Sequence, residues 1–102
     1  MAATDPLTEL EVGKYAELAK RPNPNHLVLQ YIPSLAAILL RAERLAGVPL
    51  TRAQVEKIRD HSSVTVASEK AAQAVQENRG YKDIRPESAW EEWKALRTQL
   101  PH

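Results

Sequence analysis

The chain contains no cysteine and no phenylalanine, and only three of its 102 residues are glycine. Without cysteine there is no disulfide, no thiol nucleophile and no zinc site with sulfur ligands. Aromatic residues make up 5% of the chain, so a core has to be built mainly from aliphatic side chains. Many of these are alanines, whose small side chains allow helices to approach one another closely.

An excess of one charge and a long apolar run are also missing. Lysine and arginine number 14 against 13 acidic residues, whereas a protein that binds polyanions usually carries a basic excess or stripe. The longest apolar run, residues 35–40, is far shorter than a membrane span. The N-terminal residues lack the basic and apolar segments of a signal peptide. We therefore expect one cytoplasmic domain over residues 1–102, with no membrane association and with little in favour of a nucleic-acid partner.

The segment 33–47 carries the strongest helical pattern. At 100° per residue, six apolar residues fall within an arc of about 120°. These are Leu35, Ile38, Leu39, Ala42, Leu45 and Ala46. Ala36 and Leu40 lie off this arc, which predicts neighbours on two sides of the helix. Pro33 suits the first turn of a helix and Gly47 suits the left-handed position after its end. This segment is therefore expected to be the central helix of a small bundle.

Further helices are predicted from their ends and spacing. They cover residues 5–20, about 52–61, about 67–79, and a last stretch that begins after residue 88. Thr51 and Gln54 have the spacing of a capping box, and so do Ser88 and Glu91. Gly80 is placed to close the helix before it.

Two short segments leave a choice between strand and other structure. Residues 27–32 fit either a strand or the first turns of the central helix, kinked at Pro33. Residues 64–66 have clear β-propensity, but a lone strand is not stable, so we interpret them as an extended linker. With no convincing second strand, we prefer the helical interpretation of 27–32. The expected fold is all-α: an irregular bundle of four to five helices around a central helix at about 33–46.

No pattern of residues indicates catalysis, a metal site or a cofactor. Residues 60–63 contain the three residue types of a hydrolase triad, but neighbours in sequence point in different directions. His61 fits better as a histidine at the end of a helix. His26, His61 and His102 lie too far apart in sequence to indicate a metal site. We therefore expect a protein that is not an enzyme.

A helix-turn-helix DNA-binding regulator is the alternative. The expected helices on either side of residues 47–51 resemble such a motif, in which a recognition helix follows a short turn. Arg52 and Lys57 are available for phosphate contacts, but Glu56 and Asp60 lie among them and weaken the positive field.

Three of the five aromatic residues, Tyr81, Trp90 and Trp93, lie in the last 22 residues. In the structural interpretation, both tryptophans pack against the helix at 67–79. In the functional interpretation, they and Arg97 form the anchor of a protein interface, where Trp, Tyr and Arg are enriched. We expect a non-catalytic protein–protein interaction module, such as a small inhibitor, immunity or adaptor protein. Its partner is another protein or a second copy in a dimer, bound through Tyr81, Trp90, Trp93 and Arg97.

Overall fold

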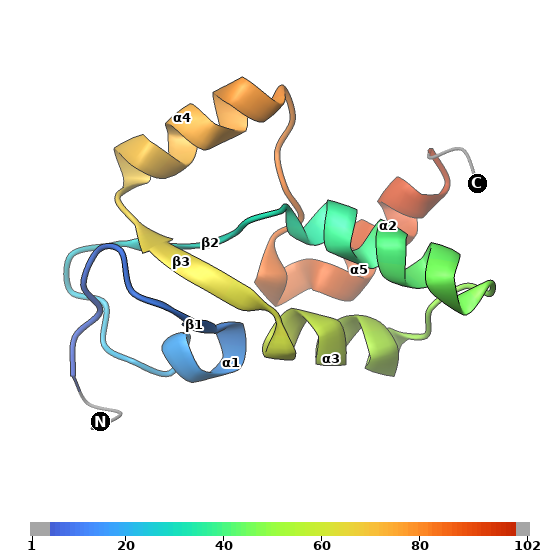
Figure 1. Ribbon diagram of the computed structural model, residues 1–102, viewed down its shortest axis with the longest axis horizontal. Coiled ribbons are helices and arrows are strands. Elements are labelled where there is room, and N and C mark those ends of the chain that lie inside the picture. The colour runs from blue at the N-terminus through green and yellow to red at the C-terminus, as the bar shows by residue number, and fades with distance from the viewer. Residues whose placement is uncertain (1–4, 100–102) are drawn as a thin grey trace.

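A computed structural model describes residues 5–99 of the chain (Figure 1). In this part the fold is mixed, with five α-helices, one 3-10 helix and a three-stranded antiparallel sheet. The elements are β1 (Val12–Lys14), α1 (Tyr15–Leu18), β2 (Val28–Tyr31), α2 (Leu35–Ala46), α3 (Arg52–His61), β3 (Ser63–Ala67), α4 (Glu69–Arg79), η1 (Pro86–Ser88) and α5 (Ala89–Arg97). The all-α prediction is therefore wrong.

The sheet has the order β1-β3-β2, so the last strand in the sequence lies in the middle. Val64 and Val66 of β3 are fully buried, and Tyr31 and Leu29 of β2 lie opposite them. Residues 64–66 are thus a central strand and not a linker, and the helical interpretation of 27–32 is wrong. Both errors have one cause: the strands that stabilise β3 come from segments more than 30 residues away in sequence.

The expected helix over residues 5–20 is reduced to the single turn of α1, preceded by β1. Arg21 fixes this region, because its guanidinium donates to both carboxylate oxygens of Glu11, at 2.6 and 3.1 Å. It also donates to the carbonyls of Asp5 and Pro6. Hydrogen bonds from Arg21 and Thr8 lower the pKa of Glu11 to about 2. These non-local bonds replace the ladder that a long helix would have formed.

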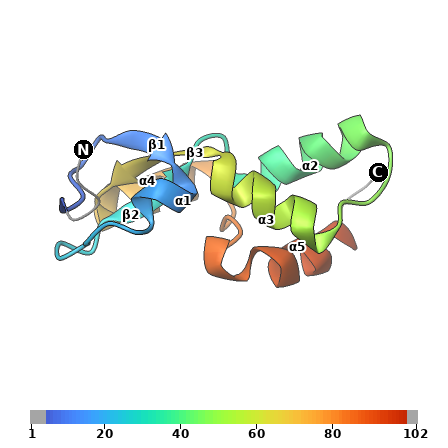
Figure 2. The ribbon, with the colours of Figure 1, turned by 90° about the horizontal axis from the view of Figure 1, so that it is seen from below.

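Helices α2, α3 and α5 form a three-helix group beside the sheet (Figure 2). The predicted capping box at Thr51 is confirmed, since its hydroxyl accepts from the Gln54 N–H and the Gln54 side chain accepts from the Thr51 N–H. Gly47 adopts the predicted left-handed conformation, with φ of 74°. Ser34 caps α2, so Pro33 lies just before the cap and not in the first turn as predicted.

The buried face of α2 differs from the predicted arc at its C-terminal end. Leu45 is 77% exposed, whereas Glu43 is buried. The Glu43 carboxylate accepts a 3.1 Å hydrogen bond from the Leu50 N–H and lies 3.2 Å from Arg97. The ion pair with Arg97 of α5 and the hydrogen bond from the Leu50 N–H therefore stabilise the buried Glu43 carboxylate. Leu45, in the last turn of α2, is exposed to solvent instead.

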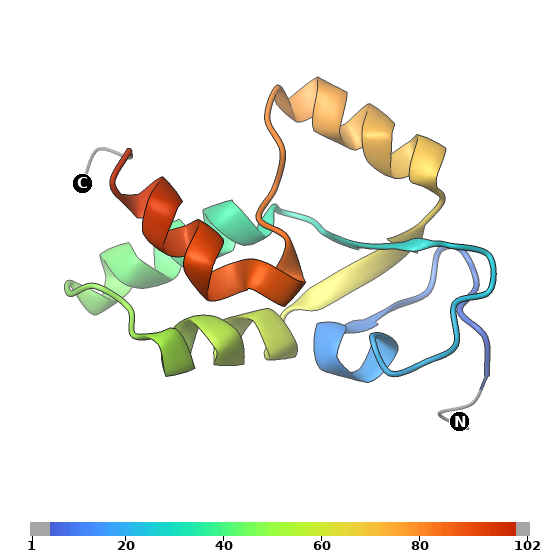
Figure 3. The ribbon, with the colours of Figure 1, turned by 180° about the vertical axis from the view of Figure 1, so that it is seen from behind.

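Helix α4 stands apart from the three-helix group and contacts β2, as Figure 3 shows from behind. Its bounds are close to the predicted 67–79, Ser68 caps its start and Gly80 closes it with φ of 81°. None of its residues is buried. The capping box predicted at Ser88 is wrong, because residues 86–88 form a 3-10 turn and the Ser88 hydroxyl makes no capping bond.

Candidate functional site

The structure separates the four residues predicted to bind a partner. Arg97 on α5 donates to the Leu50 carbonyl at 2.9 Å, close to Glu43 near the end of α2. The Tyr81 hydroxyl lies 2.8 Å from the Ser34 hydroxyl, at the start of the same helix. Ser34 and Glu43 are nine residues apart, which is about 13 Å along a helix. Tyr81 therefore does not share one surface with Arg97.

The two tryptophans have different environments. Trp93 is fully buried in the core, whereas Trp90 is half-buried beneath the cationic groups of Lys94 and Arg97, at 5.3 and 5.7 Å from its ring centre. Both rings lie on α5, which packs against α3. The interpretation that they dock onto the helix at 67–79 is wrong, because α4 lies over β2 instead.

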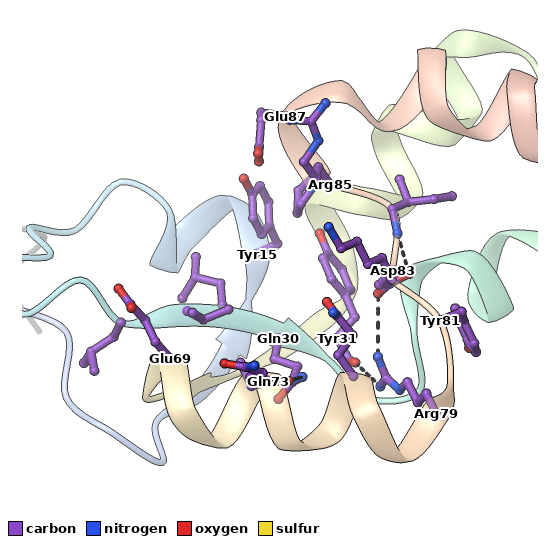
Figure 4. A pocket seen from close by; sticks show the side chains of 18 residues that line it. Tyr15, Gln30, Tyr31, Glu69, Gln73, Arg79, Tyr81, Asp83, Arg85 and Glu87 are labelled. Atoms are coloured by element: carbon purple, nitrogen blue, oxygen red, sulfur yellow. Dashed lines mark hydrogen bonds and ion pairs between the residues drawn. The ribbon is translucent and has the colours of Figure 1, made fainter.

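A groove of about 680 Å³ lies between β2 and α4. We call it the β2–α4 groove. Its floor is residues 27–31, α4 forms one wall, and residues 81–87 with Tyr15 form the other (Figure 4). Tyr81 is the one residue of the predicted set that lines it, and 47% of its surface is exposed.

The floor of the groove is the outer edge of the sheet. In an antiparallel pair, alternate residues direct their N–H and C=O toward the neighbouring strand. On β3, Val66 bonds toward β1, because its N–H donates to Glu11, so Thr65 faces β2. Thr65 is paired with Gln30, and the residues on either side of Gln30, Leu29 and Tyr31, therefore direct their backbone groups into the groove.

Side chains close both ends of this edge. The Asn23 side chain bonds the N–H and the C=O of Leu27, at 2.8 and 2.7 Å. At the other end, Arg79 donates to the Tyr31 carbonyl at 2.7 Å. The N–H and C=O of Leu29 and the N–H of Tyr31 lie between these contacts and have no partner within residues 5–99, but Tyr31 is only 2% exposed, so Leu29 is the accessible part. Natural sheets protect their edges in this way, and here a short window remains open.

The wall opposite α4 carries two stacked rings. Tyr15 and Tyr31 lie with their centroids 5.7 Å apart, and the Tyr31 hydroxyl donates to the Arg59 carbonyl at 2.8 Å. Burial raises the pKa of both phenols above the ordinary value. Both side chains are therefore neutral near pH 7. Tyr15 is half-buried and Tyr31 is buried, so Tyr15 is the ring of this pair that the groove exposes.

Asp83 anchors the end of the groove nearest to α2. Its carboxylate accepts from the N–H groups of Leu35 and Ala36, at 2.7 and 2.9 Å, in the first turn of α2. A negative charge is favourable at the start of a helix. The Arg79 guanidinium lies 3.9 Å from the same carboxylate, and Figure 4 shows the two residues at this end, with Glu69 toward the other.

A second, smaller hollow of about 470 Å³ lies beside the turn after α2, lined by Val48, Pro49 and Arg97 among others. Val48 and Leu45 are exposed nearby. In the described residues no three His, Cys, Asp or Glu side chains are grouped so that they could hold a metal ion. No helix in the same part of the chain is long and apolar enough to cross a membrane.

Sequence reasoning missed the residues that make the β2–α4 groove: Leu29, Arg79 and Asp83. The available signal was the presence of two β-prone segments, 27–32 and 64–66, which are able to pair with each other. The chain matches no family model, and the comparisons with curated proteins and with solved structures find no match either.

Proposed function

We propose that the protein is a non-catalytic protein–protein interaction module that binds its partner in the β2–α4 groove. The observation that carries the proposal is the open backbone of Leu29, a partly exposed residue on the floor of that groove. An exposed sheet edge is a ready site for another chain, and it is normally covered or blocked. Here it is blocked at its ends only and flanked by a helix and an aromatic wall.

The side chains of the groove support binding rather than catalysis. The Asp83 carboxylate is committed to the first turn of α2, and the Tyr31 hydroxyl to the Arg59 carbonyl. Arg79 holds the Tyr31 carbonyl. These groups position the walls of the groove and are not poised for proton transfer. A small inhibitor, immunity or adaptor protein needs no more than this, and a chain without cysteine suits the reducing cytoplasm.

Helix α3 gives less support to the helix-turn-helix alternative than the β2–α4 groove gives to a protein–protein interaction module. Its Arg52 pairs with Glu56 at 3.1 Å, and Arg59 pairs with Asp60 at 2.8 Å. These pairs reduce the charge available to phosphates, on which DNA affinity depends. We expect no binding to a 20-base-pair duplex in a fluorescence polarisation assay at physiological salt. Tight binding with a steep salt dependence would favour the alternative.

The proposal is tested with a phage-displayed library of random heptapeptides, selected against the folded protein. Two variants of α4 form a matched pair: Ala72 lines the groove, whereas Ala74 is exposed on α4 and lies outside the groove. We expect Ala72→Trp to fill the groove and to lower the affinity of selected peptides at least about tenfold. Ala74→Trp should leave the affinity within about twofold.

Circular dichroism of both variants checks that α4 is intact. If Ala72→Trp unfolds the protein, Tyr81→Ala at the rim of the groove replaces it, with an expected loss in the same direction. Selected peptides that bind the wild type and both variants equally, or a library that yields no binder, would contradict the proposal.

A further inference from the structure

We propose that the occupant of the β2–α4 groove is an extended peptide segment of a partner protein, which adds to the outer edge of β2 as a fourth strand. This inference rests on the proposed function and names the kind of partner. It also assigns a charge order: a basic residue of the segment faces Glu69, and an acidic residue faces Arg79 and Lys82.

The backbone of β2 sets the mode of binding. Leu29 offers one donor and one acceptor to the groove, whereas Tyr31 is only 2% exposed. An extended chain pairs with Leu29 through two hydrogen bonds, as in other cases of strand addition. A helix cannot do so, because its own backbone groups are already bonded internally. The open backbone therefore selects an extended segment over an amphipathic helix.

The ends of the window limit the length and the register of that segment. Asn23 covers the edge at Leu27, and Arg79 covers it at the Tyr31 carbonyl. From Glu69 to Arg79 the α4 wall has ten residue steps, or about 15 Å. An extended chain rises about 3.3 Å per residue, so four to five residues span the wall. A long strand, such as another sheet edge, meets the blocking side chains at either end.

The two walls predict alternating side chains. In a strand added to β2, successive side chains point to opposite faces. One set faces Ala72 and Gln76 of α4, where small or polar residues fit. The other set faces Tyr15, whose half-buried ring stacks on the buried Tyr31 and favours aromatic or β-branched residues across the strand.

The charges of the groove are unevenly distributed along it. Glu69 lies at the start of α4, whereas Arg79 ends the helix and Lys82 follows shortly after it. Asp83 is close to Arg79 but is occupied by the backbone of α2. Because Arg79 lies 3.9 Å from the Asp83 carboxylate, Lys82 is the cation at the end near Tyr31 that has no ion pair among residues 5–99. The opposite end offers the Glu69 carboxylate to a cation.

The decisive measurement is amide hydrogen exchange by NMR, with the heptapeptides selected from the random library as the probe. The Gln30 N–H is already bonded to β3 in the free protein, whereas those of Leu29 and Tyr31 face the groove. A saturating peptide should slow exchange at Leu29 by roughly tenfold or more, and should leave Gln30 within about twofold. Selected sequences should alternate apolar and polar residues and carry opposite charges at their two ends.

A backbone scan of the peptide gives an independent readout. Methylation of a peptide nitrogen removes a donor and adds bulk, so it should abolish binding only at alternate positions, where the N–H faces β2. Methylation at the positions between should have little effect. A uniform loss at every position, or no loss at any, would contradict strand addition.

On the protein side, Leu29→Pro and Leu29→Ala form a matched pair. Both shorten the side chain, but only proline removes the outward N–H, and an edge strand tolerates proline where that N–H faces away from its neighbour. We expect Leu29→Pro to weaken peptide binding at least about tenfold more than Leu29→Ala does. If Leu29→Pro fails to fold, the methylation scan of the peptide still tests whether the peptide adds to β2 as a strand.

The charge order is tested by Glu69→Lys and Lys82→Glu. The first should lower the affinity of peptides with a basic residue at the Glu69 end, and the second that of peptides with an acidic residue at the other. Unchanged affinity in both variants, at low and at high salt, would remove the charge order from the proposal.

Three other outcomes overturn the peptide as occupant. Selected peptides with apolar residues at helical spacing and no protection of Leu29 would indicate a helix in the groove. A dimer in light scattering that Leu29→Pro dissociates would indicate a second copy. Binding at Leu29 by free amino acids or nucleosides alone would indicate a small ligand. A helix in the groove would contradict strand addition but not the proposed function, provided that Ala72→Trp still abolishes binding. The failure of this inference and the failure of the proposed function are therefore distinguishable.

Discussion

Helices α3 and α4 have nearly the same length, ten and eleven residues, but they are stabilised in different ways. Helix α3 packs against α1 on one side and α5 on another, and its Val55 is fully buried. Helix α4 has no buried residue and contacts mainly β2, through half-buried residues such as Ala72 and Arg79. Packing therefore stabilises the three-helix group, whereas α4 depends on its caps and on a few polar contacts.

This contrast explains where the groove lies. A helix packed on several sides leaves no room at its flanks, but a helix that rests on one strand leaves open space on either side of its contact. The groove that we propose as a binding site lies in the region with the weakest packing, and binding elements are often drawn from the less stable parts of a protein. The following predictions test the contrast, beginning with the largest expected effect.

Leu39→Asp should unfold the protein. Leu39 is fully buried in the three-helix group, and an unpaired charge in such a core costs more than about 4 kcal/mol. Leu45→Asp is the matched control on the same helix, and it should change the free energy of unfolding by less than about 0.5 kcal/mol because Leu45 is exposed. Urea denaturation measures both. Equal effects would show that α2 is not oriented as described.

Asp83→Ala should lower the free energy of unfolding by about 2–3 kcal/mol, because Asp83 joins the segment after α4 to the first turn of α2. The carboxylate accepts from two N–H groups of α2, and hydrogen bonds to a charged group contribute about 1.5–3 kcal/mol. Glu87→Ala removes an exposed carboxylate from the same wall of the groove and should cost less than about 0.5 kcal/mol. The comparison of their unfolding midpoints in urea tests whether Asp83 anchors α2. A midpoint unchanged in Asp83→Ala would refute that role.

Thr51→Ala and Ser88→Ala compare two positions with the same sequence signal. The Thr51 hydroxyl accepts from the Gln54 N–H, so its loss should cost about 1 kcal/mol. The Ser88 hydroxyl makes no capping bond, so Ser88→Ala should be close to neutral. Thermal unfolding of the two variants distinguishes the formed cap from the unformed one. A larger effect at Ser88 would mean that its hydroxyl does cap α5 and would contradict the difference between the two positions.

The smallest effect is expected at Glu11, and it depends on pH. Its pKa is about 2 in the folded protein and 4.5 ordinarily, because Arg21 and Thr8 bond the ionised form. The stability that this carboxylate contributes is therefore complete above about pH 4.5 and is lost as the pH falls toward 2. The difference in stability between the wild type and Glu11→Gln should shrink over that range.

Glu17→Gln, which removes an exposed charge from α1, serves as the control for Glu11 and should show no such convergence between pH 4.5 and 2. A constant difference between the wild type and Glu11→Gln from pH 7 to pH 2 would contradict the ion pair with Arg21.

The helices of the three-helix group were largely predictable from sequence, because their ends are local. Gly47, Thr51 and Gln54 determine where α2 ends and α3 begins through bonds that span at most four residues. The same holds for α4, whose start at Ser68 and end at Gly80 follow from local rules. Helical spacing alone, however, predicted that Leu45 is buried and did not indicate that Glu43 is. The position of its partner Arg97 cannot be derived from the spacing of residues along α2.

The sheet and the groove were decided by tertiary structure. Strand β3 is stable only because Val12–Lys14 and Val28–Tyr31 pair with it from distant parts of the chain, and no local signal indicates which segments meet. The same holds for the candidate site: Tyr81 was identified from its residue type, whereas the open backbone of Leu29 exists only once β2 lies at the edge of the sheet. Caps and turns act over a few residues, so the sequence determines them by itself. Strand pairing and the burial of one tryptophan but not the other depend on contacts across the whole chain.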